Sequence, residues 1–147
     1  MELRHELRRL CYEHAQLREL GDKLRSEIAA PMPVDFSHLQ SIRGEYELLL
    51  VRHLKCEDWI LYPRINASLD KELSHLADRV FAEYGDLADR LMSYMDQWTV
   101  AAMRAEWQAY CVDTLSLLDH MDRRSAMEET VLFPAVTHEY AIHRRVG

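Results

Sequence analysis

A histidine and a glutamate with the spacing of metal ligands lie near the middle of this chain. His53 and Glu57 occupy positions i and i+4 in the stretch HLKCEDWILYP. In a helix, such residues lie one turn apart on the same face, so both side chains can reach a single metal ion. The spacing therefore indicates an imidazole–carboxylate metal site on a helix.

The latter half of this motif recurs towards the C-terminal end of the chain. In the stretch EETVLFP, Glu128 precedes Pro134 at the same spacing that separates the glutamate and the proline of the first copy. The repeat is imperfect, because Arg124 stands where the first copy has His53. Two related halves indicate a pseudo-symmetric helical bundle with a site at its centre.

Composition and charge place the chain among single all-α domains. Its 147 residues include only four glycines and four prolines, so few residues break helices. The net charge of −7, without a long basic run, argues against nucleic acid as a partner. The N-terminus has no apolar signal core, and no apolar run approaches the roughly 20 residues that span a bilayer.

The cysteines indicate a reducing compartment. Cys11, Cys56 and Cys111 have neither zinc-ribbon nor disulfide spacing. We interpret them as small buried thiols and expect a cytoplasmic protein without membrane association. Cys56 lies next to Glu57 and is a remote ligand candidate.

Four long helices are expected within a single domain of residues 1–147. Breakers and capping residues predict helices over about residues 2–28, 36–66, 71–97 and 100–133, with a short tail from about 135. The expected N-caps are Asp35 or Ser37, Asp70 and Thr99. Because the connections are short, sequential helices should pack antiparallel in an up-down-up-down four-helix bundle.

Each expected helix carries a polar residue within its apolar stripe. The inner faces follow from a rotation of about 100° per residue, which also places Ile60 on the stripe of the second helix. The polar residues on these faces are His14, His53, Glu57, Tyr84, Arg124 and Glu128. Burying such groups is costly unless they pair with one another or bind an ion, so we expect them to meet in the interior.

Other polar residues are expected away from this centre. His5 and His75 fall on the outer faces of their helices, and His120 lies too far around the fourth helix to share an ion with the glutamates. All three are predicted to be exposed or peripheral. Asp58 and Glu129 are interpreted as boundary residues near the end of the bundle.

The pattern H-x3-E-[DE]-x2-[LF]-[FY]-P on the second helix, echoed on the fourth, resembles the hemerythrin-like (HHE cation-binding) domain family. The resemblance implies an up-down-up-down bundle with a non-haem di-iron centre that binds oxygen or senses iron, redox state or nitrosative stress. The metal ligands that it implies are His14, His53, Glu57 and Glu128. Tyr84 and Arg124 depart from the pattern, which commonly has histidines there, although a tyrosine phenolate can also ligate ferric iron.

Two functions of different classes are consistent with these residues. In the first, the four ligand candidates hold one or two ions, with open positions for a small ligand such as dioxygen. Mixed nitrogen and oxygen ligands suit iron, manganese or zinc, and the resemblance implies iron. In the second, the Arg124 guanidinium replaces the ion, pairs with Glu57 and Glu128, and stabilises a metal-free structural or protein-interaction module.

No catalytic or cofactor-binding residues can be assigned from the sequence. Because no general acid, general base or substrate pocket is recognisable, the chain is not expected to be an enzyme, and a metal-dependent oxidase is a third hypothesis. Trp98 and Trp107 lie near one end of the third and fourth helices. We interpret them as boundary packing, with a surface for a homodimer or another protein partner as the alternative.

Overall fold

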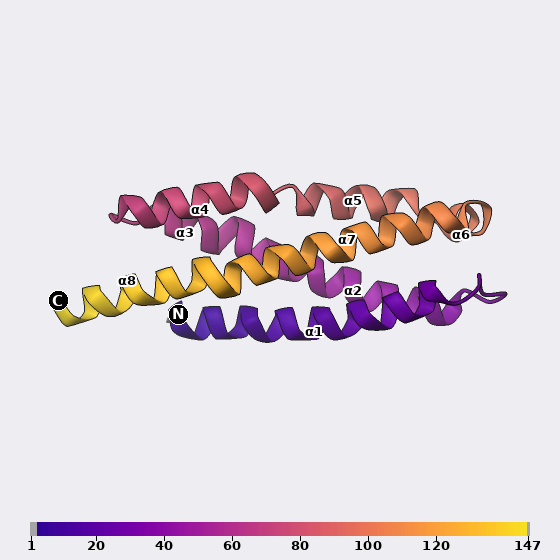
Figure 1. Cartoon of the computed structure of the whole chain (residues 1–147), viewed down its shortest axis with the longest axis horizontal. Coiled ribbons are helices and arrows are strands. Elements are labelled where there is room, and N and C mark those ends of the chain that lie inside the picture. The colour runs from indigo at the N-terminus through magenta and orange to yellow at the C-terminus, as the bar shows by residue number, and fades with distance from the viewer. Residues whose placement is uncertain (1–2, 147) are drawn as a thin grey trace.

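The computed structural model describes residues 3–146, with side chains through Glu139, and this part of the chain is all-helical without strands. Its long segments lie side by side along the long axis of the molecule (Figure 1). The all-α prediction is confirmed. The segments are α1 (Leu3–Ala29), α2 (Ser37–Cys56), η1 (Glu57–Leu61), α3 (Tyr62–Asn66), α4 (Lys71–Tyr84), α5 (Leu87–Gln97), α6 (Val100–Ala105), α7 (Trp107–Met127), η2 (Glu128–Leu132) and α8 (Phe133–Val146). Within this part of the chain, no helix combines the length and apolarity needed to cross a membrane.

The helix starts follow the capping chemistry of the sequence. The Asp70 carboxylate accepts hydrogen bonds from two backbone N–H groups of the first turn of α4, and the Thr99 hydroxyl accepts one at the start of α6. Both predicted N-caps are therefore confirmed. At the start of α2 the expectation of Asp35 or Ser37 as the N-cap is wrong, because the N-cap is Phe36 without a side-chain cap bond; the Asp35 carboxylate instead accepts hydrogen bonds from the backbone N–H and hydroxyl of Ser37.

Two of the four predicted helices are interrupted. The third divides into α4 and α5 at Gly85 and Asp86, and the fourth is interrupted at Glu106, between α6 and α7. At Gly85, an added Cβ would lie 2.4 Å from the carbonyl oxygen of Phe81 and 2.7 Å from its ring. The tight turn there needs a residue without a side chain.

Gly85 and Gly44 are expected to respond oppositely to alanine. Gly85→Ala should lower the free energy of unfolding by about 1–3 kcal/mol, because the backbone must shift to relieve the clash. Gly44 lies exposed within α2, and an added Cβ would meet no described atom within 4 Å. Gly44→Ala should therefore raise that free energy by about 0.5–1 kcal/mol, the usual gain in helix propensity. Denaturant unfolding of both variants measures the difference, and a change of the same sign in both would contradict this packing at Gly85.

Both copies of the sequence motif contain a turn of π-helix. The turns begin at Glu57 and Glu128, and in each the residue after the turn donates its backbone N–H to the carbonyl of that glutamate. A π-turn contains an extra residue, so the rotation of 100° per residue does not hold through it. For this reason the predicted inner position of Ile60 is wrong: its side chain is 60 % exposed, and Leu61 is buried instead.

The prolines of the two motifs follow these π-turns and do not end the helices. Pro63 lies in α3, and Pro134 lies at the start of α8, which continues to Val146. The wide turn offers room for a proline ring that would clash in an unbroken α-helix. The expected tail from about 135 is thus part of a helix that continues directly from the fourth.

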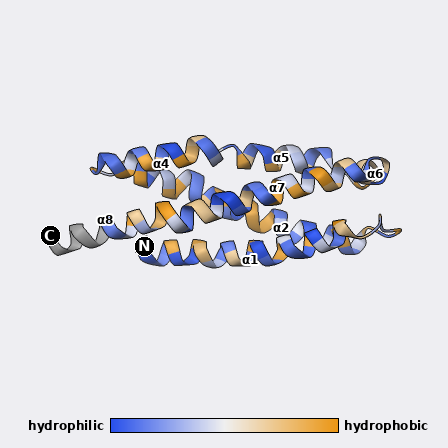
Figure 2. Cartoon of the chain, viewed as in Figure 1, coloured by the Kyte–Doolittle hydropathy of each residue, from blue (hydrophilic) through white to orange (hydrophobic). Residues whose placement is uncertain are grey.

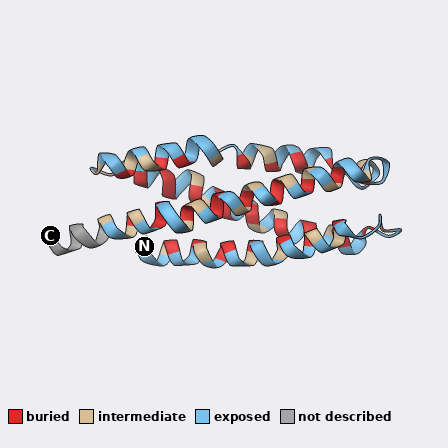
Figure 3. Cartoon of the chain, viewed as in Figure 1, coloured by how far each residue is buried: buried red, intermediate tan, exposed pale blue. Residues whose placement is uncertain are grey.

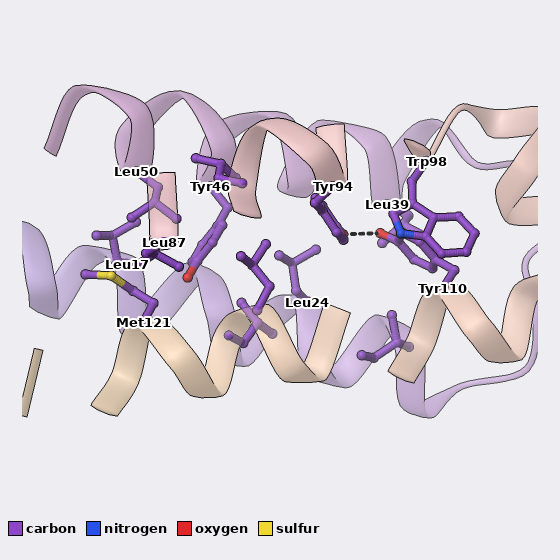
Figure 4. Packing of buried hydrophobic residues seen from close by; sticks show 14 of the residues in the cluster. Leu17, Leu24, Leu39, Tyr46, Leu50, Leu87, Tyr94, Trp98, Tyr110 and Met121 are labelled. Atoms are coloured by element: carbon purple, nitrogen blue, oxygen red, sulfur yellow. Dashed lines mark hydrogen bonds between the residues drawn. The ribbon is translucent and has the colours of Figure 1, made fainter. Parts of the chain in front are cut away.

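The apolar core consists of two clusters separated along the helices. The larger cluster includes Leu17, Leu50 and Met121, and Figure 4 shows how its side chains pack, with a hydrogen bond of 3.0 Å from the Tyr94 hydroxyl to that of Tyr110. The smaller cluster draws on the opposite ends of the same helices, at Leu10, Leu61 and Leu132 among others. The intervening stretch of α7 is hydrophilic in Figure 2 and yet buried in Figure 3. This buried polar layer is where the candidate site lies.

Trp98 and Trp107 belong to the larger cluster. Trp98 is buried, and both rings contact Tyr110, with centroid separations of 5.4 and 5.6 Å. Their contacts are those of core and boundary packing.

Candidate metal centre

Five of the six predicted inner residues come together between the two apolar clusters. They are His14, His53, Glu57, Arg124 and Glu128, and all are almost completely inaccessible to solvent. They project from α1, α2, η1, α7 and η2, so each half of the sequence repeat contributes to the layer. Helical spacing on apolar stripes explains this convergence, because the apolar neighbours above and below each residue direct that face inward.

The metal cluster is formed by His14, His53, Glu57 and Glu128. One ligand atom from each residue lies within 4.8 Å of the others. His53 Nε2 lies 2.8 Å from Glu57 Oε1, and His14 Nε2 lies 3.1 Å from Glu128 Oε1. These buried atoms lie at ion-pair distance from one another, and yet none of the four makes a well-formed hydrogen bond among the described residues. Their mutual distances are short enough for all four to bind one ion.

The outer nitrogens of both imidazoles are held by carboxylates. His53 Nδ1 lies 2.8 Å from Glu13 Oε1, and His14 Nδ1 lies 3.1 Å from Glu129 Oε1. An ionised carboxylate only accepts hydrogen bonds, so the Nδ1 atoms carry protons and, in the neutral rings, the Nε2 lone pairs point into the cluster. This arrangement, in which a carboxylate orients a histidine, is typical of metal ligands.

The supporting carboxylates were not identified from the sequence. Glu13 received no role, and Glu129 was interpreted as a boundary residue. Each lies next to a ligand candidate in the sequence, since Glu13 precedes His14 and Glu129 follows Glu128. The cross-helix contact of Glu13 with His53 depends on the relative position of α1 and α2, which adjacency in sequence does not indicate.

Arg124 lies on the other side of the two glutamates. Its Nε donates to Glu128 Oε2 over 3.3 Å, and its Nη2 lies 3.6 Å from Glu57 Oε1. The guanidinium also donates to the Asp58 carboxylate and, over 3.2 Å, to the backbone carbonyl of Tyr84. Asp58 is half-buried, so it contacts the layer from its edge, in agreement with the prediction of a boundary residue. Each glutamate thus lies between the histidines and the arginine.

A second donor completes the environment of Glu128. The Tyr62 hydroxyl donates a hydrogen bond of 2.8 Å to Glu128 Oε2, the oxygen that Arg124 also contacts. Oε2 is thus satisfied twice, whereas Oε1, which faces His14, remains without a hydrogen bond in the described part of the chain. The sequence motif contains Tyr62 but does not indicate this role.

The prediction that the Tyr84 side chain points into the centre is wrong. Its ring meets the His120 ring edge-on, with 6.1 Å between the centroids, and its hydroxyl lies beside the exposed Glu83 carboxylate. Only the backbone carbonyl of Tyr84 reaches the site. The reason is local, because α4 ends at Tyr84 and the chain turns at Gly85. The phenol is therefore not a ligand candidate in this structure.

Among the histidines with described side chains, those other than His14 and His53 lie outside the metal cluster. His5 and His75 are exposed, as predicted. His120 is more enclosed than an exposed residue: its side chain is only 12 % accessible, and its Nε2 lies 3.4 Å from the Asp86 carboxylate. It packs at the break between α4 and α5, away from the ligand atoms, so its predicted peripheral position is confirmed.

The buried layer carries an excess of negative charge. Glu57, Glu128 and Asp58 surround the guanidinium of Arg124, which leaves two carboxylate charges for protons or an ion to balance. Burial and the nearby Glu128 carboxylate raise the pKa of Glu57. Burial alone would lower the pKa of His53, but Glu57 and Glu13 raise it to about 10. Without an ion, the layer thus retains protons, and a divalent cation would supply the two missing charges.

The donor set fits such a cation. Two neutral imidazoles and two carboxylates are ligands of iron, manganese and zinc, and the four residues leave room in the coordination sphere of an ion that takes more than four ligands. Three separate observations therefore favour a cation here: the buried ligand atoms without hydrogen bonds, the imidazoles held by carboxylates, and the excess of negative charge.

Comparisons with protein-family models, with curated proteins and with solved structures find no match for this chain.

Proposed function

We propose that this chain is a hemerythrin-like protein that binds one metal ion through His14, His53, Glu57 and Glu128. The proposal includes an up-down-up-down arrangement of four antiparallel helices, formed by α1, by α2 with its continuation to α3, by α4 with α5, and by α7 with its continuation to α8. Its support is the resemblance of the two motifs to that family, together with the side-by-side packing of these segments (Figure 1).

The observation that carries the proposal is the set of unpartnered ligand atoms. A buried polar atom without a hydrogen bond costs about 1–3 kcal/mol, and more where the group is charged. His14 Nε2, His53 Nε2, both oxygens of Glu57 and Glu128 Oε1 are all in this state among the described residues, and all belong to one cluster. A cation bound among these atoms would satisfy all of them together.

Arg124 explains why we propose one ion and not two. The resemblance implies a di-iron centre, in which the glutamates lie between two ions. Here the guanidinium contacts the outer oxygen of Glu128 and approaches Glu57, so a fixed positive charge occupies the region of a second cation. Since arginine stays protonated, it repels an ion at that position.

Iron is the ion that we propose, on the strength of the family resemblance. When bound, it would supply redox chemistry and open coordination positions for a small ligand such as dioxygen, which suits a binding or sensing role. The protein residues orient the imidazoles through Glu13 and Glu129 and keep bulk water out of the layer. The three free cysteines are consistent with a reducing compartment such as the cytoplasm.

Elemental analysis of protein purified without chelator tests this proposal. We expect about one iron per chain, together with an optical spectrum of non-haem iron that chelation removes. About two ions per chain would contradict the role of Arg124. Complete absence of metal, with no uptake of added iron, manganese or zinc, would exclude the proposal and favour a metal-free module.

The metal-free module remains the second candidate, and the contacts of Arg124 favour it. The guanidinium already pairs with Glu128 and Asp58 and so stabilises the bundle without an ion. In this case the chain would serve as a structural or interaction module. It explains the outer oxygen of Glu128, but it leaves both oxygens of Glu57 and the other inner atoms of the cluster without hydrogen bonds among the described residues.

Removal of a supporting carboxylate should weaken metal binding without removing a ligand. Glu13→Gln replaces the charged acceptor of His53 by a neutral amide, so the ring is held less firmly and is a weaker base. We expect the dissociation constant for the metal to rise about 10–100-fold. Competition with a chelator of known affinity measures it. Glu19→Gln, an exposed position on the same helix, is the control and should change nothing; equal effects in the two variants would show that the contact with His53 is irrelevant to binding.

A further inference from the structure

A surface pocket of about 640 Å³ lies against the outer side of the candidate centre. Residues of α1, η2 and α8 line it, with an apolar floor that includes Leu7 and Phe133. Cys11 and Glu129 form part of its wall. The Glu129 side chain is 31 % exposed, whereas the inner ligand candidates are sealed from solvent. The pocket is thus an accessible space directly behind His14.

A second group of metal-ligating side chains includes these two wall residues and the buried His14 behind them. Cys11, His14 and Glu129 each place a ligand atom within 4.8 Å of the others. His14 is common to both groups: its Nε2 belongs to the metal cluster, and its Nδ1 lies 3.1 Å from Glu129 Oε1. The thiol distinguishes the outer group from the inner one, which contains only nitrogen and oxygen ligands.

We propose that Cys11, Glu129 and the Nδ1 edge of His14 form an outer site for a thiophilic divalent cation such as Zn²⁺ or Cd²⁺. Thiolate, imidazole and carboxylate are the ligands that zinc takes in proteins, and the adjoining pocket lets solvent complete its coordination. The cation would displace the proton that Nδ1 shares with Glu129, and the thiol would bind as thiolate.

The outer site should bind more weakly than a closed zinc site. Arg4 and Arg8 also line the pocket, and an Arg18 nitrogen lies 3.7 Å from Glu129 Oε2, so three positive groups oppose the incoming ion. Its coupling to the inner site rests on the proposed function. If an ion is bound to His14 Nε2, two cations share one ring and repel, so each lowers the affinity for the other.

Titration of the whole chain with Cd²⁺ tests the outer site, because cadmium–thiolate bonds absorb in the ultraviolet. We expect the absorption to appear in the parent protein, to be lost in Cys11→Ser, and to survive in Cys56→Ser and Cys111→Ser. The two control cysteines are also free and partly buried but do not belong to the outer group. Circular dichroism checks that each variant is folded.

Cadmium bound per chain, measured by dialysis and elemental analysis, separates this proposal from the inner site. Thiolate absorption that is lost in Cys11→Ser, while about one ion remains bound, supports both sites. The same loss with no ion remaining supports the outer site and contradicts the inner one. Three results would overturn the outer site. The parent could bind cadmium without thiolate absorption, the absorption could persist in Cys11→Ser, or Cys56→Ser could lose as much of it as Cys11→Ser does.

Discussion

Replacement of Arg124 by alanine is expected to lower the free energy of unfolding of the metal-free protein by about 3–5 kcal/mol. The guanidinium is fully buried and contacts the carboxylates of Glu128 and Asp58, with Glu57 nearby. Its removal leaves these charges facing one another in a medium that solvates them poorly. Urea unfolding in the presence of chelator measures the loss.

The adjacent arginine provides a matched control for this result. Arg123 is exposed, so Arg123→Ala removes the same chemical group from the surface and should change the free energy of unfolding by less than about 0.5 kcal/mol. Similar losses in both variants would mean that Arg124 contributes only ordinary packing. Its role as a buried counter-charge to the glutamates would then have to be abandoned.

Replacement of His53 by alanine is expected to abolish stabilisation by metal. Binding to the folded state alone stabilises a protein by about 4 kcal/mol when the free ion is 1,000-fold above its dissociation constant. His53→Ala removes one of the four ligand candidates and leaves Glu13 without its imidazole partner. The measurement is the melting temperature with added iron or zinc and with chelator; only the difference between the two conditions is compared.

His75→Ala is the control for the loss of a histidine. His75 is exposed on α4 and lies outside the metal cluster, so this variant should keep the full metal-dependent rise in melting temperature. Because the comparison is made within each variant, a general destabilisation by either substitution does not affect the result. A full metal response in His53→Ala would exclude His53 as a ligand.

Helical periodicity was sufficient to identify the buried polar layer. His14, His53, Glu57 and Glu128 each lie within an apolar stripe of about 3.6-residue period, and the structure brings these four together. The caps at Asp70 and Thr99 were predictable for the same reason, since a cap depends on residues within one turn of itself. Features with a local physical cause can be predicted from local sequence.

The tertiary structure alone decided which residues contact the buried polar layer and which side chains of each helix face it. The π-turn at Glu57 adds a residue to its turn and so exposes Ile60. The turn between α4 and α5 at Gly85 directs the Tyr84 side chain outward. The contacts of Glu13 with His53 and of Arg124 with Asp58 join different helices. Such contacts depend on how far one helix is shifted along another and on how it is rotated, and these quantities follow from the packing of the whole core rather than from the residues that make the contact.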